Sequence, residues 1–378
     1  MGWKRHLLEA CVSLMARQAR CLEAIPAIPE AILVLRNNDL GDLLVVTPLF
    51  EALRRQFPKT RIVAGVGRWN VDVLIGNPYV DEVVLVNAPW HNKFVTGQSL
   101  KSALRYIWLS EESKKLAQHK FDVGIDVLGS QFGSLLMMHL GIPYRLGVRG
   151  YAGGHTGVQQ CIDFDETVHA GRAALKFAEL LGATYFPVCR PQIYLTDKER
   201  HVGSCQWVEV DKIGAKRRIV IGPGGGFPEK CWPLPNFIHL VRMLETLGDV
   251  DIMVVGGTKD QGAAQEIAAG SSITRSLAGM LSLRETFALV AAADLVITNP
   301  SMLMHAAAAF YVNTIVVLGD YFASASLHDK QWGYPNTCVS LGKDRHVAEI
   351  ASPTQAFETA GKYLARPFRQ SHGAFTGS

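Results

Sequence analysis

The sequence predicts an α/β protein made of two Rossmann-like domains with parallel sheets that face each other across a central cleft. Short runs rich in Val, Ile and Leu alternate with segments of helical periodicity, which is typical of parallel sheets covered on both faces. The alternation begins at residue 31 and begins again near residue 218. At 378 residues, 48% of them hydrophobic, the chain is long enough to build two cores.

Composition excludes several classes of protein. The formal net charge of +4 suits an anionic ligand, but no cluster of Lys and Arg with interleaved aromatics indicates nucleic-acid binding. The seven cysteines are dispersed and lack Cys-x-x-Cys or paired Cys/His spacing, which argues against a disulfide framework or a structural zinc site. We therefore expect a reducing, cytoplasmic setting. No apolar run reaches the length of a transmembrane helix.

Residues 1–30 predict an amphipathic helical extension ahead of the first strand. The sequence allows two interpretations of it. Residues 1–25 lie on an anionic membrane surface as a peripheral contact, or the helix packs on the body of the protein, which we favour. Glu9 interrupts the apolar stretch and argues against a signal peptide. The residues expected on one apolar face are Trp3, Leu7, Leu8, Cys11, Leu14, Met15 and Leu22.

The first Rossmann-like domain is expected over residues 31–190. Its first strand, at 31–36, ends in the loop NNDLGD, which leads into an amphipathic helix at 48–57. The other expected elements are strands at 61–67, 82–87 and 121–129 and helical segments at 99–118 and 170–182. Apolar strands of this kind fit a parallel sheet that is buried on both faces.

The second Rossmann-like domain is expected over residues 191–345, with a C-terminal helix and tail at 346–378. The alternation restarts with a strand at 218–221. The elements that follow are helices at 235–247, 260–269, 282–292 and 302–309 and strands at 251–257, 294–299 and 314–320. In both domains we expect ligands beyond the carboxyl ends of the strands.

A glycine-rich turn follows the strand at 218–221. Gly224, Gly225 and Gly226 precede Lys230 and an amphipathic helix. Glycines let backbone N–H groups close on an anion, a helix N-terminus favours negative charge, and a lysine adds a cation. A flexible turn with a solvated lysine is the alternative. The spacing matches neither G-x-x-x-x-G-K-[ST] nor G-x-G-x-x-G.

Four segments stand in order between residues 31 and 345. They are ILVLRNNDLGDLLVVTPLFEALRRQFP, YRLGVRG with the later VHAGRAALKFAELLG, GPGGGFPEKCWP, and ADLVITNPSMLMHAAAAF. Together they resemble glycosyltransferase family 9, the ADP-heptose:lipopolysaccharide heptosyltransferases. The third resembles the family's phosphate loop with its K-x-W-P signature, and the fourth its N-D-S-G-x-x-H-x-A-A-A motif. The resemblance implies the GT-B architecture, with an N-terminal acceptor domain and a C-terminal nucleotide-sugar domain.

The resemblance implies an inverting, metal-independent glycosyltransferase. Such an enzyme moves a sugar, heptose by default, from an ADP-linked donor to a lipopolysaccharide-type or other glycan acceptor. It needs no cofactor besides its nucleotide-sugar substrate, and it works in the cytoplasm or peripherally at the inner face of the inner membrane. An inverting transfer requires a base for the acceptor hydroxyl and positive potential at the departing diphosphate.

Asp42 matches the position of the family's proposed base. A carboxylate can accept the hydroxyl proton if it lies within hydrogen-bond reach. The competing interpretation is a helix N-cap, which Asp39 fits about as well on position alone. With the family's pattern added, we favour Asp42 as the base.

The expected donor site lies in the second domain. Lys230 matches the family's diphosphate-binding lysine, and Asp260 matches an acidic position that contacts the adenosine ribose, although an exposed first-turn Asp would look the same. His305, which alone would more often be a packed residue, forms with Ser301 the family's donor-contacting pair. The whole expected donor set is Gly224, Gly225, Gly226, Lys230, Asp260, Ser301, Met302 and His305.

Two further features leave alternatives open. Arg145 and Arg149 could bind anionic groups of an acceptor or be solvated loop arginines. Pro300 and Met302 replace the family's Asp and Gly around Ser301, which removes a carboxylate and adds a bulky side chain. The chain could therefore be a nucleotide-sugar or glycan-binding protein without catalysis, or a transferase with a different nucleotide-sugar donor.

Overall fold

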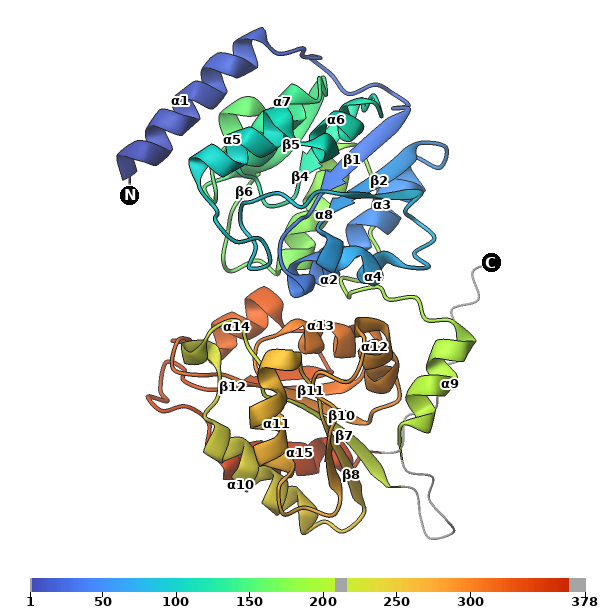
Figure 1. Ribbon diagram of the computed structural model, residues 1–378, viewed down its shortest axis with the longest axis vertical. Helices are drawn as coiled ribbons and strands as arrows, with labels where there is room; N and C mark the ends of the chain where they lie inside the picture. Colours follow the sequence, from blue (N-terminus) through green and yellow to red (C-terminus); the bar gives the residue numbers. More distant parts are fainter. Residues whose placement is uncertain (1, 208–215, 367–378) are drawn as a thin grey trace. The chain divides into compact units, whose positions relative to one another are not determined.

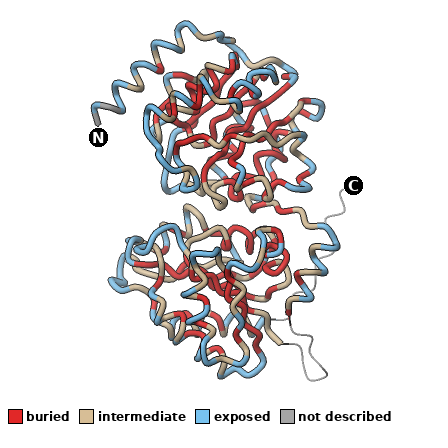
Figure 2. The backbone as a smooth tube through the Cα atoms, viewed as in Figure 1, coloured by how far each residue is buried: buried red, intermediate tan, exposed pale blue. Residues whose placement is uncertain are grey.

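The computed structural model describes residues 2–207 and 216–366, which divide into two compact units between Tyr194 and Leu195 (Figure 1). Each unit has its own six-stranded parallel sheet and its own buried apolar core (Figure 2). The predicted fold class, two Rossmann-like domains of the GT-B type with parallel sheets, is confirmed. The C-terminal tail expected after residue 366 lies outside the described residues.

The sheet of the N-terminal unit has the strand order β3-β2-β1-β4-β5-β6. Its strands are β1 Ala31–Leu35, β2 Arg61–Val66, β3 Glu82–Leu85, β4 Val123–Asp126, β5 Tyr144–Arg149 and β6 Gln160–Asp163. β1 is buried along its whole length, and its last residue, Leu35, pairs with Asp126 at the end of β4. Because the order reverses between β1 and β4, the loops after these strands lie at the crevice where such sheets bind ligands.

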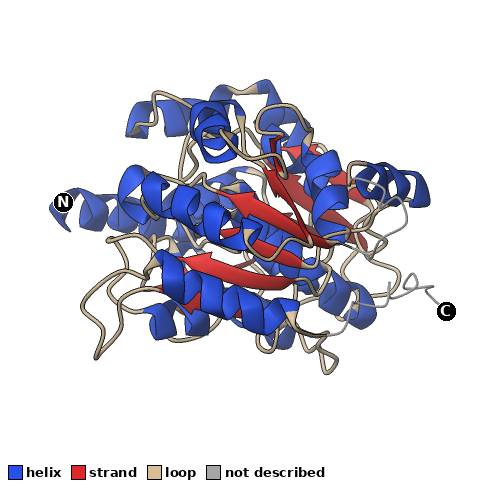
Figure 3. Ribbon diagram, turned by 90° about the horizontal axis from the view of Figure 1, so that it is seen from below, coloured by secondary structure: helices blue, strands red, loops and turns tan. Residues whose placement is uncertain are grey.

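Helices lie on both sides of the strands (Figure 3). In the N-terminal unit, Ala31, Leu33 and Leu35 of β1 point into a core shared with α5, α6 and α7, whereas α2 and α3 pack against α8. The helices are α1 Gly2–Gln18, α2 Leu40–Val46, α3 Pro48–Gln56, α4 Val71–Leu74, α5 Leu100–Leu109, α6 Glu111–Ala117, α7 Gln131–His139 and α8 Ala170–Leu180, with short 3₁₀ turns η1 Arg68–Asn70 and η2 His155–Gly157.

The C-terminal unit repeats the topology of the first. Its strand order, β12-β11-β10-β7-β8-β9, is the same when the strands of each unit are counted from that unit's first strand. The strands are β7 Arg217–Gly222, β8 Val250–Val254, β9 Thr274–Ser276, β10 Leu295–Thr298, β11 Asn313–Val317 and β12 Cys338–Leu341. Gly222 at the end of β7 pairs with Thr298 at the end of β10, so the loops after β7 and β10 meet at the reversal point.

The helices of the C-terminal unit are α9 Asp197–Cys205, α10 Leu234–Glu245, α11 Gln261–Ala268, α12 Leu283–Ala291, α13 Met302–Ala309, α14 Ala325–Trp332 and α15 Pro353–Leu364, with 3₁₀ turns η3 Pro228–Lys230 and η4 Thr258–Asp260. Of these, α10, α11 and α15 enclose a core around Trp232 and Phe237. The α9 helix packs on α12, where Arg284 Nε and Nη2 donate to the two carboxylate oxygens of Glu199 at 2.7 and 2.8 Å. That ion pair holds α9 against α12.

The sequence missed one helix that matters for function. The predicted helix at 48–57 is present as α3, but α2 precedes it and begins at Leu40, so Asp42 lies in a helical turn and not in a loop. The sequence did not predict α7, α9, α14, β5, β6, β9 or β12. The β6, β9 and β12 strands are at sheet edges, where a strand is less apolar than the central strands.

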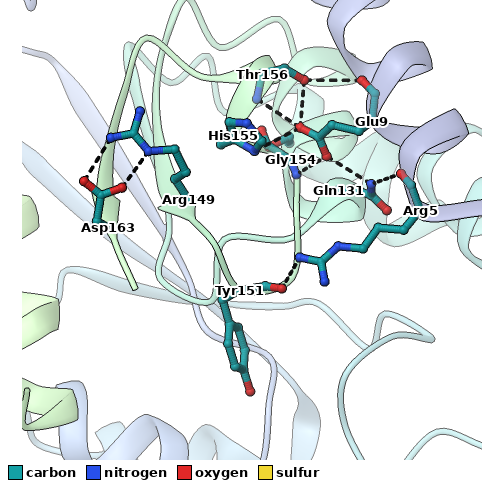
Figure 4. A network of polar contacts seen from close by, with 10 residues as sticks. Arg5, Glu9, Gln131, Arg149, Tyr151, Gly154, His155, Thr156 and Asp163 are labelled. Carbon is teal, nitrogen blue, oxygen red and sulfur yellow. Dashed lines mark hydrogen bonds and ion pairs between the residues drawn. The ribbon is translucent and has the colours of Figure 1, made fainter. Parts of the chain in front are cut away.

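The α1 helix packs on the N-terminal unit, as we favoured, through a polar network around Glu9 (Figure 4). Its Oε2 atom accepts hydrogen bonds from Gly154 N at 2.7 Å and Gln131 Nε2 at 3.0 Å, and Oε1 accepts from the Thr156 hydroxyl at 2.8 Å. Val12, one turn further on, is fully buried in the core. The helix is therefore held to the N-terminal unit through the side that carries Glu9 and Val12.

The single apolar face expected for residues 1–25 is wrong. Leu8 packs on the core, together with Val12, whereas Trp3, Leu7 and Leu14 are exposed. The apolar residues of α1 form two faces, one inside and one outside, and the pattern alone could not separate them.

We predict that α1 loosens from the unit in acid. Burial raises the pKa of Glu9, but hydrogen bonds from Gly154, Gln131 and Thr156 outweigh burial and leave that pKa below its ordinary value. A lowered folded-state pKa means that the ionised carboxylate stabilises the packed helix fully above about pH 5, and that this contribution is lost as the pH falls through the folded-state pKa. Amide hydrogen exchange of residues 2–18, corrected for intrinsic rates, should show less protection at about pH 3 than at about pH 7. Glu9→Gln should remove most of this difference, and equal protection in the wild type would contradict the prediction.

Candidate functional site

The glycine loop of the C-terminal unit is held by a buried asparagine from the neighbouring strand end. Asn299, which follows β10 and is fully buried, donates from Nδ2 to Pro223 O at 2.5 Å. Its Oδ1 atom accepts from Trp232 N at 2.8 Å, and its own N–H bonds Gly222 O at 3.1 Å. One side chain thus fixes both ends of the segment that contains the glycines and Lys230. Asn299 was not among the site residues predicted from the sequence, although it directly precedes Pro300.

Two of the three glycines lie in close contact with neighbouring side chains. A Cβ on Gly224 would lie 2.6 Å from Asp260 Oδ2, and a Cβ on Gly225 would lie 2.6 Å from Cys231 Sγ, so a larger residue at either position would displace that side chain. A Cβ on Gly226 would meet nothing within 4 Å. The structure therefore brings Asp260 against the glycine loop, as the donor-site expectation requires. The same carboxylate accepts from Gly257 N at 2.8 Å.

Lys230 has aromatic surroundings. Its Nζ atom lies 4.7 Å from the ring centroid of Phe227, 5.1 Å from that of Tyr321 and 5.7 Å from that of Phe322. Tyr321 and Phe322 belong to the loop after β11, which is fastened to the lysine's own backbone: Gly319 N donates to Lys230 O at 3.2 Å. Ammonium groups are attracted to the faces of aromatic rings. The rings therefore fix where this cation lies.

Gly319 makes this attachment possible. A Cβ at that residue would lie 2.5 Å from Cys231 O and 2.6 Å from Glu229 O. Trp232, on the other side of the lysine, is buried in the core, where its Nε1 donates to Ala351 O at 2.7 Å. Trp232 therefore anchors this turn to the core. An apolar hollow of about 230 Å³ adjoins this segment, lined by Pro223, Pro228, Cys231, Trp232, Pro233, Leu234, Phe237 and Ala263.

Ser301 and His305 lie on α13 but differ in environment. Ser301 is the N-cap, and its hydroxyl lies 3.0 Å from Thr298 Oγ1 at the end of β10. His305 is buried inside the unit, and its Nδ1 atom lies 2.6 Å from the Tyr334 hydroxyl. Met302 begins the helix. The glycine loop, Lys230, Asp260 and Ser301 thus lie at the carboxyl ends of β7, β8 and β10. His305 is buried inside the unit.

In the N-terminal unit, Asp42 occupies the first turn of α2 and takes part in two interactions. Its Oδ2 atom accepts from Asp39 N at 3.1 Å, which is the bond of a helix-capping residue. Its Oδ1 atom lies 3.3 Å from Arg36 Nη2. The Arg36 side chain is almost fully buried, but 33% of the Asp42 side chain is exposed. Asp39 sits at the cap position and pairs with Lys93, whose Nζ lies 3.5 Å from Asp39 Oδ2.

Capping and proton acceptance are compatible at Asp42. The hydrogen bond to Asp39 N and the Arg36 guanidinium orient the carboxylate, while its exposed third remains accessible to an acceptor hydroxyl. The loop before it is also fixed, because Asn38 O accepts from Trp69 Nε1 at 2.8 Å and from Asn70 Nδ2 at 2.9 Å.

A second carboxylate, missed by the sequence analysis, ends β4 beside this loop. Asp126 is buried, and burial raises its pKa against hydrogen bonds from Ser130 that lower it. His91 interacts with it electrostatically: burial lowers the pKa of His91, while the Asp126 charge opposes that shift. The His91 backbone has φ +54°, an uncommon conformation for a residue with a side chain. The signal in the sequence was the position of Asp126 at a strand's carboxyl end.

The expectation for Arg145 needs correction, whereas that for Arg149 stays a prediction. Arg145 lies in β5, 1% exposed, and donates from Nε to Gly157 O at 2.8 Å and from Nη1 to Ile142 O at 2.6 Å and Arg20 O at 2.8 Å. It is therefore neither a solvated loop residue nor accessible to an acceptor. Arg149 is exposed, but Asp163 holds its Nε and Nη2 at 2.6 and 2.9 Å, which raises the pKa of the arginine and lowers that of the carboxyl.

The described residues, 2–207 and 216–366, contain no group of three or more His, Cys, Asp or Glu side chains placed to hold a metal ion. No helix within them combines the length and apolar character that crossing a bilayer requires.

The family model of glycosyltransferase family 9 (heptosyltransferase) matches residues 111–344, more than half of the chain. Lipopolysaccharide heptosyltransferase 2 of Escherichia coli strain K12 is 24% identical over 306 residues, which cover 76% of this chain and 82% of that protein.

Solved structures of other proteins have a similar fold. A glycosyl transferase family 9 protein from Veillonella parvula DSM 2008 matches with a TM-score of 0.72 and 21% identity, covering 89% of this chain and 97% of that one. The E. coli ADP-heptose lps heptosyltransferase II matches with a TM-score of 0.67 and 21% identity, covering 88% of this chain and 98% of that one.

Proposed function

The chain belongs to glycosyltransferase family 9, and we propose that it is an inverting, metal-independent transferase that moves a sugar from an ADP-linked donor. The sugar is heptose by default, and the acceptor is a lipopolysaccharide-type or other glycan. The observation that carries this proposal is the set formed by the glycine loop, Lys230 and Asp260 at the carboxyl ends of β7 and β8. The ADP-heptose donor named for the E. coli relative supports the choice of nucleotide.

The donor half of the reaction belongs to the C-terminal unit. Backbone N–H groups of Gly225 and Gly226 and the Lys230 ammonium would bind the diphosphate, and Lys230 would neutralise the charge that develops on it as the bond to the sugar breaks. Asp260, held against Gly224, would accept from a ribose hydroxyl. Ser301 and His305 at α13 complete the proposed donor contacts.

The acceptor half belongs to the N-terminal unit. The acceptor hydroxyl oxygen would attack the anomeric carbon, the carbon–oxygen bond to the diphosphate would break, and the hydroxyl proton would pass to the Asp42 carboxylate. A single displacement of this kind inverts the anomeric centre. Arg36 lies against Oδ1 of Asp42, and Oδ2, which accepts a hydrogen bond from Asp39 N, would take the proton through its second lone pair. Arg149, at the end of β5, stays a weaker proposal for acceptor binding, since an acceptor would have to displace Asp163.

One observation favours a second candidate, a protein that binds a nucleotide-sugar without transferring it. Pro300 offers neither a carboxylate nor an N–H group, and Met302 places a side chain where relatives have none. These two residues begin the segment that would lie against the donor sugar. We therefore expect them to change the binding of the sugar and not the binding of the nucleotide. A transferase with another nucleotide-sugar fits the same observation.

A nucleotide-sugar screen tests these candidates. We expect ADP and ADP-heptose to raise the melting temperature and the corresponding UDP- and GDP-sugars to leave it unchanged, because a ligand that binds only the native state stabilises it. Incubation of ADP-heptose with a heptose-lacking lipopolysaccharide acceptor should then release ADP. Stabilisation by UDP- or GDP-sugars alone would contradict the ADP assignment, and stabilisation without any ADP release would favour the binding protein.

A further inference from the structure

The outer face of α1, defined here by Trp3, Leu7, Cys11 and Leu14, is apolar and exposed. Trp3, Leu7 and Leu14 are 69%, 58% and 61% exposed. Their spacings of four, four and three residues place the four side chains along one side of the helix. Scattered apolar side chains are ordinary on a protein surface, but a continuous stripe along a helix is typical of a surface that binds a partner.

The packing of α1 fixes the direction of this face. Glu9 and Val12 lie on the opposite side of the helix and hold it to α7 and η2 through the network of Figure 4 and the core. Gln131 adds a second attachment by donating from Nε2 to Arg5 O at 2.8 Å. The outer face therefore cannot turn inward without breaking these bonds.

The same packing determines which charged side chains of α1 are exposed. Glu9 is the one acidic residue of α1, and its carboxylate accepts hydrogen bonds from Gly154 and Thr156 on the inner side of the helix. Arg5 is also turned to the inner side, where its guanidinium donates to Tyr151 O. The exposed charged side chains at the C-terminal end of α1 and just after it include Arg17 and Arg20, and the next acidic residue along the chain is Glu23. The apolar stripe is thus followed by two exposed arginines and carries no carboxylate.

We propose that the outer face of α1 docks on an anionic lipid bilayer, with Leu7 and Leu14 entering the interface and the arginines contacting lipid phosphates. A helix that lies in the membrane plane combines an apolar face with basic residues, which is the arrangement found here. A second copy of the chain fits less well, because a two-fold interface would bring the same arginines together. The proposal rests on the packing of α1 and not on transferase activity.

Vesicle flotation of the full-length protein tests the proposal. We expect binding to phosphatidylcholine vesicles that contain phosphatidylglycerol, and weak binding to pure phosphatidylcholine. The double substitution Leu7→Glu with Leu14→Glu should lower the bound fraction by about tenfold or more, because it removes two apolar anchors and adds negative charge. Arg17→Glu should lower it less, and binding by the wild type should weaken as salt is raised.

Leu109→Glu is the matched control. Leu109 is 65% exposed at the end of α5 in the same unit, so its substitution makes the same chemical change outside the outer face and should leave flotation unchanged. ADP affinity and melting temperature of each variant show that the fold and the donor site are intact. Equal flotation of the wild type and the double variant, or equal binding to both kinds of vesicle, would overturn the proposal. So would a double variant that changes only the mass measured by light scattering, which would identify a second copy as the partner.

Discussion

Asp42→Asn should lower the rate of sugar transfer by a factor of roughly 10²–10⁴, the usual contribution of a general base. Asparagine preserves the shape of the side chain and can still accept from Asp39 N, so α2 keeps its first turn. What is lost is the proton acceptor, together with the ion pair to Arg36. ADP affinity should hardly change, because Asp42 belongs to the N-terminal unit and the proposed donor contacts belong to the C-terminal unit.

The control for this experiment is Asp39→Asn. Asp39 sits three residues earlier in the same turn, and asparagine is as good an N-cap as aspartate. Its substitution removes the pairing with Lys93 but no proposed chemistry, so turnover should stay near the wild-type rate. ADP release measures turnover, and calorimetry measures ADP affinity. Wild-type turnover in Asp42→Asn, or an equal loss in Asp39→Asn, would remove Asp42 from the role of base.

Much of the fold could be predicted because its central strands are buried on both faces. β1 and β10 are continuous apolar runs, since each has strand neighbours on two sides and helices on both faces. The missed edge strands gave no such signal. β9, for example, is Thr-Arg-Ser, and its pairing with β8 is a tertiary fact that the local sequence does not carry.

The candidate site was predictable where one segment supplied it and not where several did. The glycine loop and Lys230 are adjacent in the sequence, so spacing pointed to them. The rings of Tyr321 and Phe322 come from the loop after β11, and only the sheet order brings them to Lys230. The prediction for Arg145 was wrong because its place in the fold differs from what its neighbours in the sequence suggest. Its sequence neighbours suggested a loop, but β5 carries it into the interior, where backbone carbonyls accept its hydrogen bonds.

Lys230→Ala should weaken ADP binding by roughly 10- to 100-fold, since a hydrogen bond to a charged group contributes about 1.5–3 kcal/mol. Transfer should fall further than affinity, because negative charge on the leaving diphosphate grows as the bond to the sugar breaks. The nearby rings strengthen this expectation, because Phe227 and Tyr321 attract the ammonium and favour one position for it.

Three further variants decide whether the charge of Lys230 or its aromatic surroundings determine ADP affinity. Lys259→Ala removes an exposed lysine of the same unit, next to Asp260, and should leave ADP affinity unchanged. Tyr321→Leu keeps the Lys230 charge but removes one ring, so it should weaken ADP binding by less than Lys230→Ala does, with Tyr321→Phe restoring it. Calorimetry with ADP measures all four proteins. Unaltered affinity in Lys230→Ala would mean that the diphosphate is held by backbone N–H groups alone, and a loss in Lys259→Ala as large as in Lys230→Ala would mean that the effect is general to the surface charge of the unit.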